Sequence, residues 1–154
     1  MNETTEGWEI HIKEMDLFEE LDFKVMEEIA DTACTEVAYD KGTVIFSEGD
    51  SADALFCLYE GVVDLQIGGE STVYSLTEKS DIFGWSSLVA NTTYTATAIA
   101  NTDIQAIKIN AYKLNRVLNA NPSFGLEIYR RLSAVFNKRL SNIYGLFLSI
   151  PSVL

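Results

Sequence analysis

The chain has 154 residues, of which 47% are hydrophobic, and this is enough for one domain, residues 1–154, with a buried core. Its formal net charge of −12 argues against nucleic acid as a partner, because phosphate binding needs clustered cations. The chain has no run of about 20 apolar residues, and its N-terminus is acidic where a signal peptide is basic and then apolar. We therefore expect a cytoplasmic protein without a membrane span.

The residues that could carry metal or catalytic chemistry are few and scattered. Cys34 and Cys57 are far apart and form no CxxC pair, so we expect two small buried hydrophobic side chains and neither a metal site nor a disulfide. His11 is the single histidine and has no partner at catalytic spacing, which favours a surface or capping role. Because no nucleophile with a base and no paired carboxylates are visible, an enzyme is the least favoured class, and we assign no catalytic residue and no cofactor.

The hydrophobic period divides the chain into three parts. Residues 8–33 repeat apolar side chains every three or four positions, which predicts N-terminal helices. Residues 35–110 contain eight short β-rich runs separated by turn signals, which predicts antiparallel strands in a sandwich or barrel. Residues 111–148 predict C-terminal helices, the last of which begins near Pro122 and is long.

Two stretches carry a resemblance to a known family. The first, DKGTVIFSEGDSADALFCLYEGVVDLQIGG, places Gly49 and Asp50 at a turn, and Tyr59 and Gly61 around the next hairpin. The second, FGWSSLVANTTYTATA, aligns without a gap on a phosphate-binding cassette. In this order of parts, residues 15–145 resemble the cyclic-nucleotide-binding domain of catabolite activator proteins, gated channels and kinase regulatory subunits. The resemblance implies a mainly β fold, an antiparallel eight-stranded jelly roll (double-stranded β-helix) with N-terminal helices and a long C-terminal helix.

The cassette lacks the two charged side chains that the resemblance implies. In the family a glutamate accepts a hydrogen bond from the ribose, and an arginine pairs with the phosphate. Here Trp85 stands directly after Gly84, and Tyr94 stands ten residues after it, at the positions of these two side chains. No Lys or Arg occurs between Lys79 and Lys108 to replace them. The ligand-binding site that the resemblance implies consists of Phe83, Gly84, Trp85, Ser86, Ser87, Leu88, Tyr94, Thr95 and Ala96.

Two interpretations of this aromatic pair remain open. In the first, Trp85 and Tyr94 line an altered pocket and stack on a planar or apolar ligand, while their N–H and O–H groups orient it. In the second, the pocket is lost and the two aromatic side chains fill the space. The orientation of Trp85 decides between them.

The last helix carries two further expectations. The resemblance implies that this helix lies against the mouth of the pocket, so Arg130 or Arg131 could reach an anion there as a lid. The alternative is that both are ordinary exposed residues, together with Lys138 and Arg139.

The same helix is also the expected dimer interface, because the matching helix of the family pairs with its own copy around a twofold axis. We expect a homodimer through one continuous apolar stripe, Tyr129, Leu132, Phe136, Leu140 and Ile143. After Leu148 too few residues remain for a helix-turn-helix, so we expect no DNA-binding output domain. The apolar tail, residues 146–154, is expected either to cover a groove of the barrel or to bind a partner.

The functional hypothesis is a stand-alone regulatory or sensor module for signal transduction. It binds an unidentified small ligand in an altered pocket, signals through its C-terminal helix, and is not a tight binder of cyclic AMP or cyclic GMP. The alternative hypothesis is a ligand-free interaction scaffold with a filled pocket, which acts on a partner protein.

Overall fold

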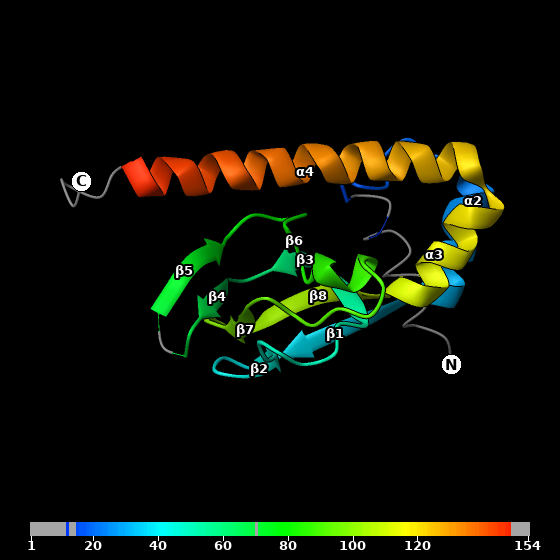
Figure 1. The fold of residues 1–154 in the computed structure, drawn as a ribbon. Coiled ribbons are helices and arrows are strands. Elements are labelled where there is room, and N and C mark those ends of the chain that lie inside the picture. Colours follow the sequence, from blue (N-terminus) through cyan, green and yellow to red (C-terminus); the bar gives the residue numbers. More distant parts are fainter. Residues whose placement is uncertain (1–11, 13–14, 70, 149–154) are drawn as a thin grey trace.

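The computed structural model describes residues 12, 15–69 and 71–148. His11 and the last six residues of the apolar tail lie outside the described residues, as does most of the expected helical segment before residue 15. The predicted fold class is confirmed: eight antiparallel strands form a jelly roll that is flanked by helices, the last of them long (Figure 1).

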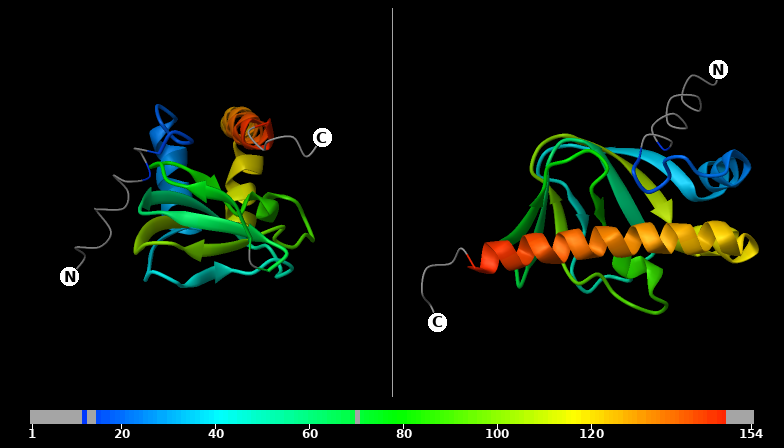
Figure 2. Two further views of the ribbon diagram at one scale, coloured as in Figure 1. Left: turned by 90° about the vertical axis from the view of Figure 1, so that its left-hand side faces the viewer. Right: turned by 90° about the horizontal axis from the view of Figure 1, so that it is seen from above.

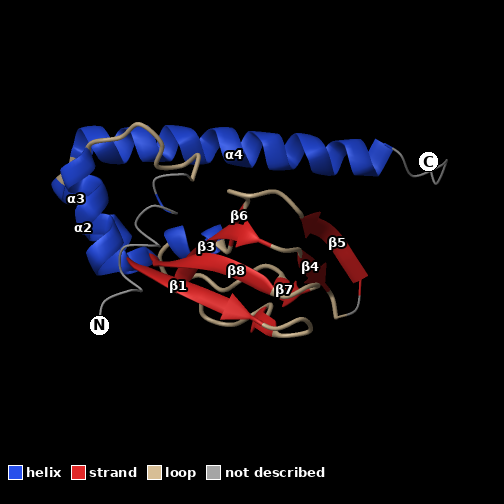
Figure 3. Cartoon of the chain, turned by 180° about the vertical axis from the view of Figure 1, so that it is seen from behind, coloured by secondary structure: helices blue, strands red, loops and turns tan. Residues whose placement is uncertain are grey.

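The strands coincide closely with the eight β-rich runs of the sequence. They are β1 (Cys34–Tyr39), β2 (Val44–Phe46), β3 (Ala54–Glu60), β4 (Val63–Ile67), β5 (Ser71–Leu76), β6 (Ile82–Phe83), β7 (Thr97–Ala100) and β8 (Ile104–Asn110). They pair antiparallel into two four-stranded sheets, ordered β1-β8-β3-β6 and β2-β7-β4-β5. Figure 3 shows the two sheets folded over each other beneath the long helix.

Strand β3 connects the two parts of the core, because it is buried on both faces. Since successive side chains of a strand point to opposite faces, Phe56 and Leu58 face the interior of the roll, while Leu55 and Cys57 face the helices. This double burial explains why the run ALFCLYE is almost continuously apolar. Cys57 is fully buried as expected, whereas Cys34 at the start of β1 is partly exposed, and both thiols are free.

Two short helices close one end of the roll. Helix α2 (Phe23–Ala33) begins at Asp22, whose carboxylate accepts hydrogen bonds from the backbone N–H groups of Lys24 and Val25. Helix α3 (Ala111–Ala120) begins at Asn110, whose side chain accepts from the N–H of Lys113. Both helices pack on the outer face of β3 and β8, so the chain leaves the roll in a fixed direction.

Helix α4 (Pro122–Leu148) is the feature that shapes the molecule. It has 27 residues and runs along the roll for most of its length, as the view from above shows (Figure 2). Among the described residues, no helix is long and apolar enough to cross a membrane.

The apolar stripe of α4 is not continuous, which corrects one expectation. Leu132 has no exposed surface and packs, with Ile128, in the protein's own core, and Phe136 is half-buried against it. Tyr129 is exposed, and its hydroxyl donates to Asn115 of α3. Leu132 is therefore not available to a dimer partner, because the first half of the stripe covers the roll and helices of the same chain.

The second half of the stripe is exposed. The large apolar side chains that face solvent there are Leu140, Ile143, Tyr144, Leu146, Phe147 and Leu148. Of the residues expected in the dimer helix, Leu140 and Ile143 therefore lie on this exposed half.

Candidate functional site

The cassette is built on a glycine whose backbone other residues rarely adopt. Gly84 follows β6 with φ of +77°, and a Cβ atom there would lie 3.0 Å from the carbonyl oxygen of Ala54. The chain then enters η1 (Trp85–Leu88), a single 3₁₀ turn in which the Ser87 hydroxyl donates to the Gly84 carbonyl. The backbone shape expected of the cassette is therefore present, and Phe83 lies buried immediately before it.

Tyr94 fills the place where the family's arginine is expected. The side chain is 5% exposed, and its hydroxyl donates to the carbonyl of Ala54 at 2.6 Å and accepts from the N–H of the same residue at 3.2 Å. Its ring stacks on Phe46 with the ring centres 3.8 Å apart. Burial raises the pKa of Tyr94 above its ordinary value, because a phenolate would lose its hydration there. The hydroxyl is thus engaged by the protein's own backbone.

Other aromatic rings extend this packing into the roll. Phe56 and Phe83 stack with ring centres 5.0 Å apart, and Phe46 lies 5.8 Å from Phe56 and 6.1 Å from Phe83. Each such pair of rings stabilises the fold by about 0.5–1.5 kcal/mol, in addition to the stabilisation from the apolar area that it buries. A four-ring cluster of Phe46, Phe56, Phe83 and Tyr94 therefore occupies the interior beside the cassette.

Trp85 points toward α4 and forms the contact between cassette and helix. Its ring lies 4.8 Å from the ring of Phe136, and the guanidinium of Arg139 lies 4.8 Å from the centre of the indole. Helix α4 thus covers the indole, and both contacts, from Phe136 and Arg139, come from one turn of this helix.

Arg139 is the site residue that sequence reasoning missed. It was grouped with the exposed basic residues of the last helix, yet it is 7% exposed and donates to the carbonyl of Ile82 at 2.7 Å. Its guanidinium also lies 4.8 Å from the centre of the Tyr74 ring. Burial lowers the pKa of Arg139, opposed by Tyr74 and Asp81. The signal was its spacing: Arg139 follows the buried Leu132 by seven positions and Phe136 by three, on the same helix face.

The space that remains at the cassette is small. A cavity of about 70 Å³ is lined by Phe46, Leu65, Phe83, Gly84, Trp85, Ser86, Tyr94, Thr95, Ala96 and Arg139. Pockets for small-molecule ligands usually measure about 300–1,000 Å³. The structure thus brings most of the expected site residues together, with Ser87 and Leu88 behind them in η1, but around a remnant of a pocket.

Neither arginine expected as a lid lies at this cavity. Arg130 is exposed, and Arg131 donates to the backbone carbonyls of Asp16, Leu17 and Glu19 and pairs with Glu127 at 3.2 Å. Arg131 therefore ties α4 to the segment before α2. Among the described residues, no group of three or more His, Cys, Asp or Glu side chains could hold a metal ion.

Comparison with known proteins agrees with this fold. The family model of the cyclic nucleotide-binding domain matches residues 36–121, from β1 through the cassette to α3. The chain belongs to the cyclic nucleotide-binding domain family.

Its curated relatives include regulatory subunits of cAMP-dependent protein kinase. One from Candida albicans is 30% identical over 84% of this chain and 25% of its own length, and one from Dictyostelium discoideum is 29% identical over 56% and 27%. The chain thus spans about a quarter of the length of the curated relatives that it matches.

Solved structures show the same architecture over nearly the whole chain. A candidate cyclic nucleotide-binding protein from Geobacter metallireducens has a TM-score of 0.74 and 30% identity, covering 89% of this chain and 98% of its own. The regulatory subunit of a cAMP-independent protein kinase A from Trypanosoma brucei has a TM-score of 0.69 and 19% identity, covering 90% and 51%.

Proposed function

We propose that this chain is a regulatory module that does not bind cyclic nucleotides through its cassette and that signals through helix α4. The observation that carries the proposal is the filling of the cassette by the protein's own side chains. Tyr94 stands at the expected position of the phosphate-binding arginine and is bonded to Ala54, and Trp85 is covered by Phe136 and Arg139. Of the two interpretations drawn from the sequence, this geometry supports the filled pocket over the altered one.

The cost of admitting a cyclic nucleotide supports this proposal. A cyclic phosphate must lose water when it is enclosed, and a paired cation normally offsets that loss. The one cation at the remaining cavity, among the described residues, is Arg139, and its guanidinium is already packed between Trp85 and Tyr74. Binding would have to displace Tyr94 from Ala54 and separate Arg139 from Trp85.

The route of output is helix α4, because the cassette and the helix are in direct contact. Phe136 and Arg139 hold the middle of the helix on the roll, so its last part, residues 140–148, is presented in one orientation. Its exposed apolar residues include Leu140 and Ile143. A second copy of the chain is the partner that we propose for this surface, which gives a homodimer.

The test of the cassette is a calorimetric titration of the purified protein with cyclic AMP and cyclic GMP. We expect no binding in the sub-micromolar range, and native mass spectrometry should show no nucleotide retained from the cells. The variant Trp85→Glu with Tyr94→Arg restores the two missing charges, so it should bind cyclic AMP more tightly than the parent protein. Sub-micromolar binding to the parent protein would contradict the proposal.

A further inference from the structure

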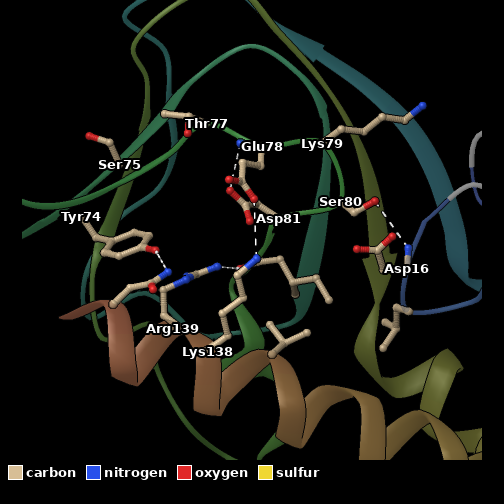
Figure 4. A pocket seen from close by; sticks show the side chains of 14 residues that line it. Asp16, Tyr74, Ser75, Thr77, Glu78, Lys79, Ser80, Asp81, Lys138 and Arg139 are labelled. Atoms are coloured by element: carbon tan, nitrogen blue, oxygen red, sulfur yellow. Dashed lines mark hydrogen bonds and ion pairs between the residues drawn. The ribbon is translucent and has the colours of Figure 1, made fainter. Parts of the chain in front are cut away.

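A second cavity lies outside the cassette, between α4 and the segment that joins β5 to β6 (Figure 4). Its volume is about 160 Å³. The side chains that give it polar walls are Asp16, Tyr74, Ser75, Thr77, Glu78, Lys79, Ser80, Asp81, Lys138, Arg139 and Asn142. It is thus larger than the cassette remnant and far more polar.

The buried cation of this cavity has no negative charge in contact with it. Arg139 donates a hydrogen bond to the Ile82 carbonyl and lies against the rings of Tyr74 and Trp85, all of them uncharged groups. No carboxylate of the described residues comes within 4.0 Å of it. Burying a charge without a paired counter-charge is costly, so such a group in a native protein calls for a partner.

Asp81 supplies the opposite charge on the facing wall. Its carboxylate accepts from the backbone N–H of Glu78 at 3.0 Å and acts on Arg139 electrostatically without contacting it. Lys138 and Glu78, which also line the cavity, pair with each other at 3.6 Å. Figure 4 shows Asp81 descending from the loop and Arg139 rising from α4 toward the same space. The negative charge of Asp81 and the positive charge of Arg139 therefore face each other across the cavity.

We propose that this cavity binds a small zwitterion, namely a free α-amino acid. The ligand's carboxylate accepts hydrogen bonds from Arg139, and its ammonium group donates to Asp81, so both charges that are left apart in the protein gain a partner. The size agrees, since a cavity of about 150 Å³ is known to hold a benzene molecule. The site lies outside the cassette, and the one residue that lines both cavities is Arg139.

The position of the site connects the ligand to helix α4. Asn142, one turn after Lys138, donates to the hydroxyl of Tyr74 at 3.0 Å and closes one side of the cavity. A bound amino acid adds contacts between α4 and the loop before β6. Occupancy thus strengthens the hold of the roll on the helix.

The test is a thermal-shift screen of the full chain against the twenty common amino acids, followed by calorimetry. Acetate and methylammonium serve as half-ligands that carry only one of the two charges. We expect at least one amino acid to raise the melting temperature and to bind with a dissociation constant below about 1 mM. Acetate and methylammonium should each bind at least about tenfold more weakly, because each satisfies one charge only.

Two variants and their controls make the test specific to this cavity. Arg139→Gln and Asp81→Asn should each weaken binding by about tenfold or more, the loss expected for a hydrogen bond to a charged group. Asp81→Asn keeps an oxygen for the N–H of Glu78, so it decides the question even where Arg139→Gln fails to fold. The exposed residues Arg130 and Asp31 provide the matched controls Arg130→Gln and Asp31→Asn, which should bind as the parent does.

Three results would overturn the proposal. The first is that no amino acid binds the folded protein at a concentration of about 10 mM, which is about ten times the upper limit expected for the dissociation constant. The second is binding that Asp81→Asn leaves unchanged. The third is acetate binding as tightly as any amino acid, which would show an unspecific anion site at Arg139. A cyclic nucleotide titration bears on none of these results, so this proposal and the proposed function fail separately.

Discussion

At the scale of single residues, Tyr94 shows how a side chain of the cassette is held in the protein's own core. A ligand-binding arginine needs an external anion, whereas the phenol of Tyr94 finds both a donor and an acceptor in the backbone of Ala54. The side chain has thereby become a structural element of the roll, which leads to a prediction about stability.

We predict that Tyr94→Phe lowers the free energy of unfolding by about 1–3 kcal/mol, because it leaves buried backbone groups of Ala54 without this partner. Urea denaturation measures the change. Tyr112→Phe is the matched control, since Tyr112 is 72% exposed, and it should change the stability by less than about 0.5 kcal/mol. Equal effects of the two substitutions would show that the hydroxyl of Tyr94 is not specially placed.

Cys57 gives a pH-dependent prediction. Burial raises the pKa of this thiol from 9.0 to about 12, so the protonated thiol is favoured in the folded state. The stability that it contributes is fully present below pH 9 and is lost as the pH rises from 9 toward 12, by about 1.4 kcal/mol per pH unit.

The measurement is urea denaturation at several pH values for the parent and for Cys57→Ala. The variant should be less stable at pH 7, because a buried atom is removed, but it should lose less stability above pH 9. Parallel pH profiles of the two proteins would contradict the prediction.

The residue scale also shows the reach and the limits of sequence reasoning about the site. Trp85 and Tyr94 could be recognised because they replace charges in a stretch of fixed spacing. Arg139 could not be recognised from its type, because most arginines on helices are exposed. Its burial depends on Tyr74 and Trp85, which lie far away in sequence and meet it only in the folded chain.

At the scale of elements, helix α4 has two halves with different tasks. The first half packs Ile128 and Leu132 into the core and Phe136 on Trp85, and the second half exposes Leu140 and Ile143. The sequence predicted the helix and its start, because Pro122 and the apolar period are local signals. It could not show where the stripe changes from core to surface, because burial on α4 depends on segments such as η1 and β8 that are far away in sequence.

We predict that Phe136→Ala loosens α4 from the roll. The contact with Trp85 is lost, so the free energy of unfolding should fall by about 1–3 kcal/mol, less than for a fully buried phenylalanine. Amide hydrogen exchange should become faster in the second half of α4 while β3 and β8 stay protected. Leu126→Ala, at a position that is 55% exposed, is the control and should leave the exchange of α4 unchanged.

At the scale of the whole molecule, the number of strands and their antiparallel pairing could be predicted from the sequence, whereas the order of the strands in the two sheets and the state of assembly could not. Turn residues and alternating runs specified eight strands, and the structure pairs them as a jelly roll. The exposed half of α4 carries no charged residue from position 140 to 148, although the chain as a whole has a net charge of −12. An exposed apolar surface without charges, on a strongly acidic protein, is typical of a protein–protein interface.

We predict that the protein is a dimer at micromolar concentration through this half of α4. Sedimentation velocity measures the state directly. Ile143→Glu combined with Phe147→Glu should yield a monomer that stays folded, because both side chains face solvent in the single chain. Tyr112→Glu, on α3, should remain dimeric, and a parent protein that sediments as a monomer would refute the prediction.

One guanidinium borders both the cassette cavity and the polar cavity beside it, and this arrangement has a thermodynamic consequence. Arg139 lies at the cassette remnant and at the polar cavity beside it. A ligand that draws the guanidinium toward one cavity changes the free energy of ligand binding in the other cavity. By linkage, each ligand changes the binding free energy of the other by the same amount. A chain that restored nucleotide binding by displacing Arg139 would therefore weaken the second cavity for its ligand, so the two sites would act as mutually exclusive inputs to the same helix.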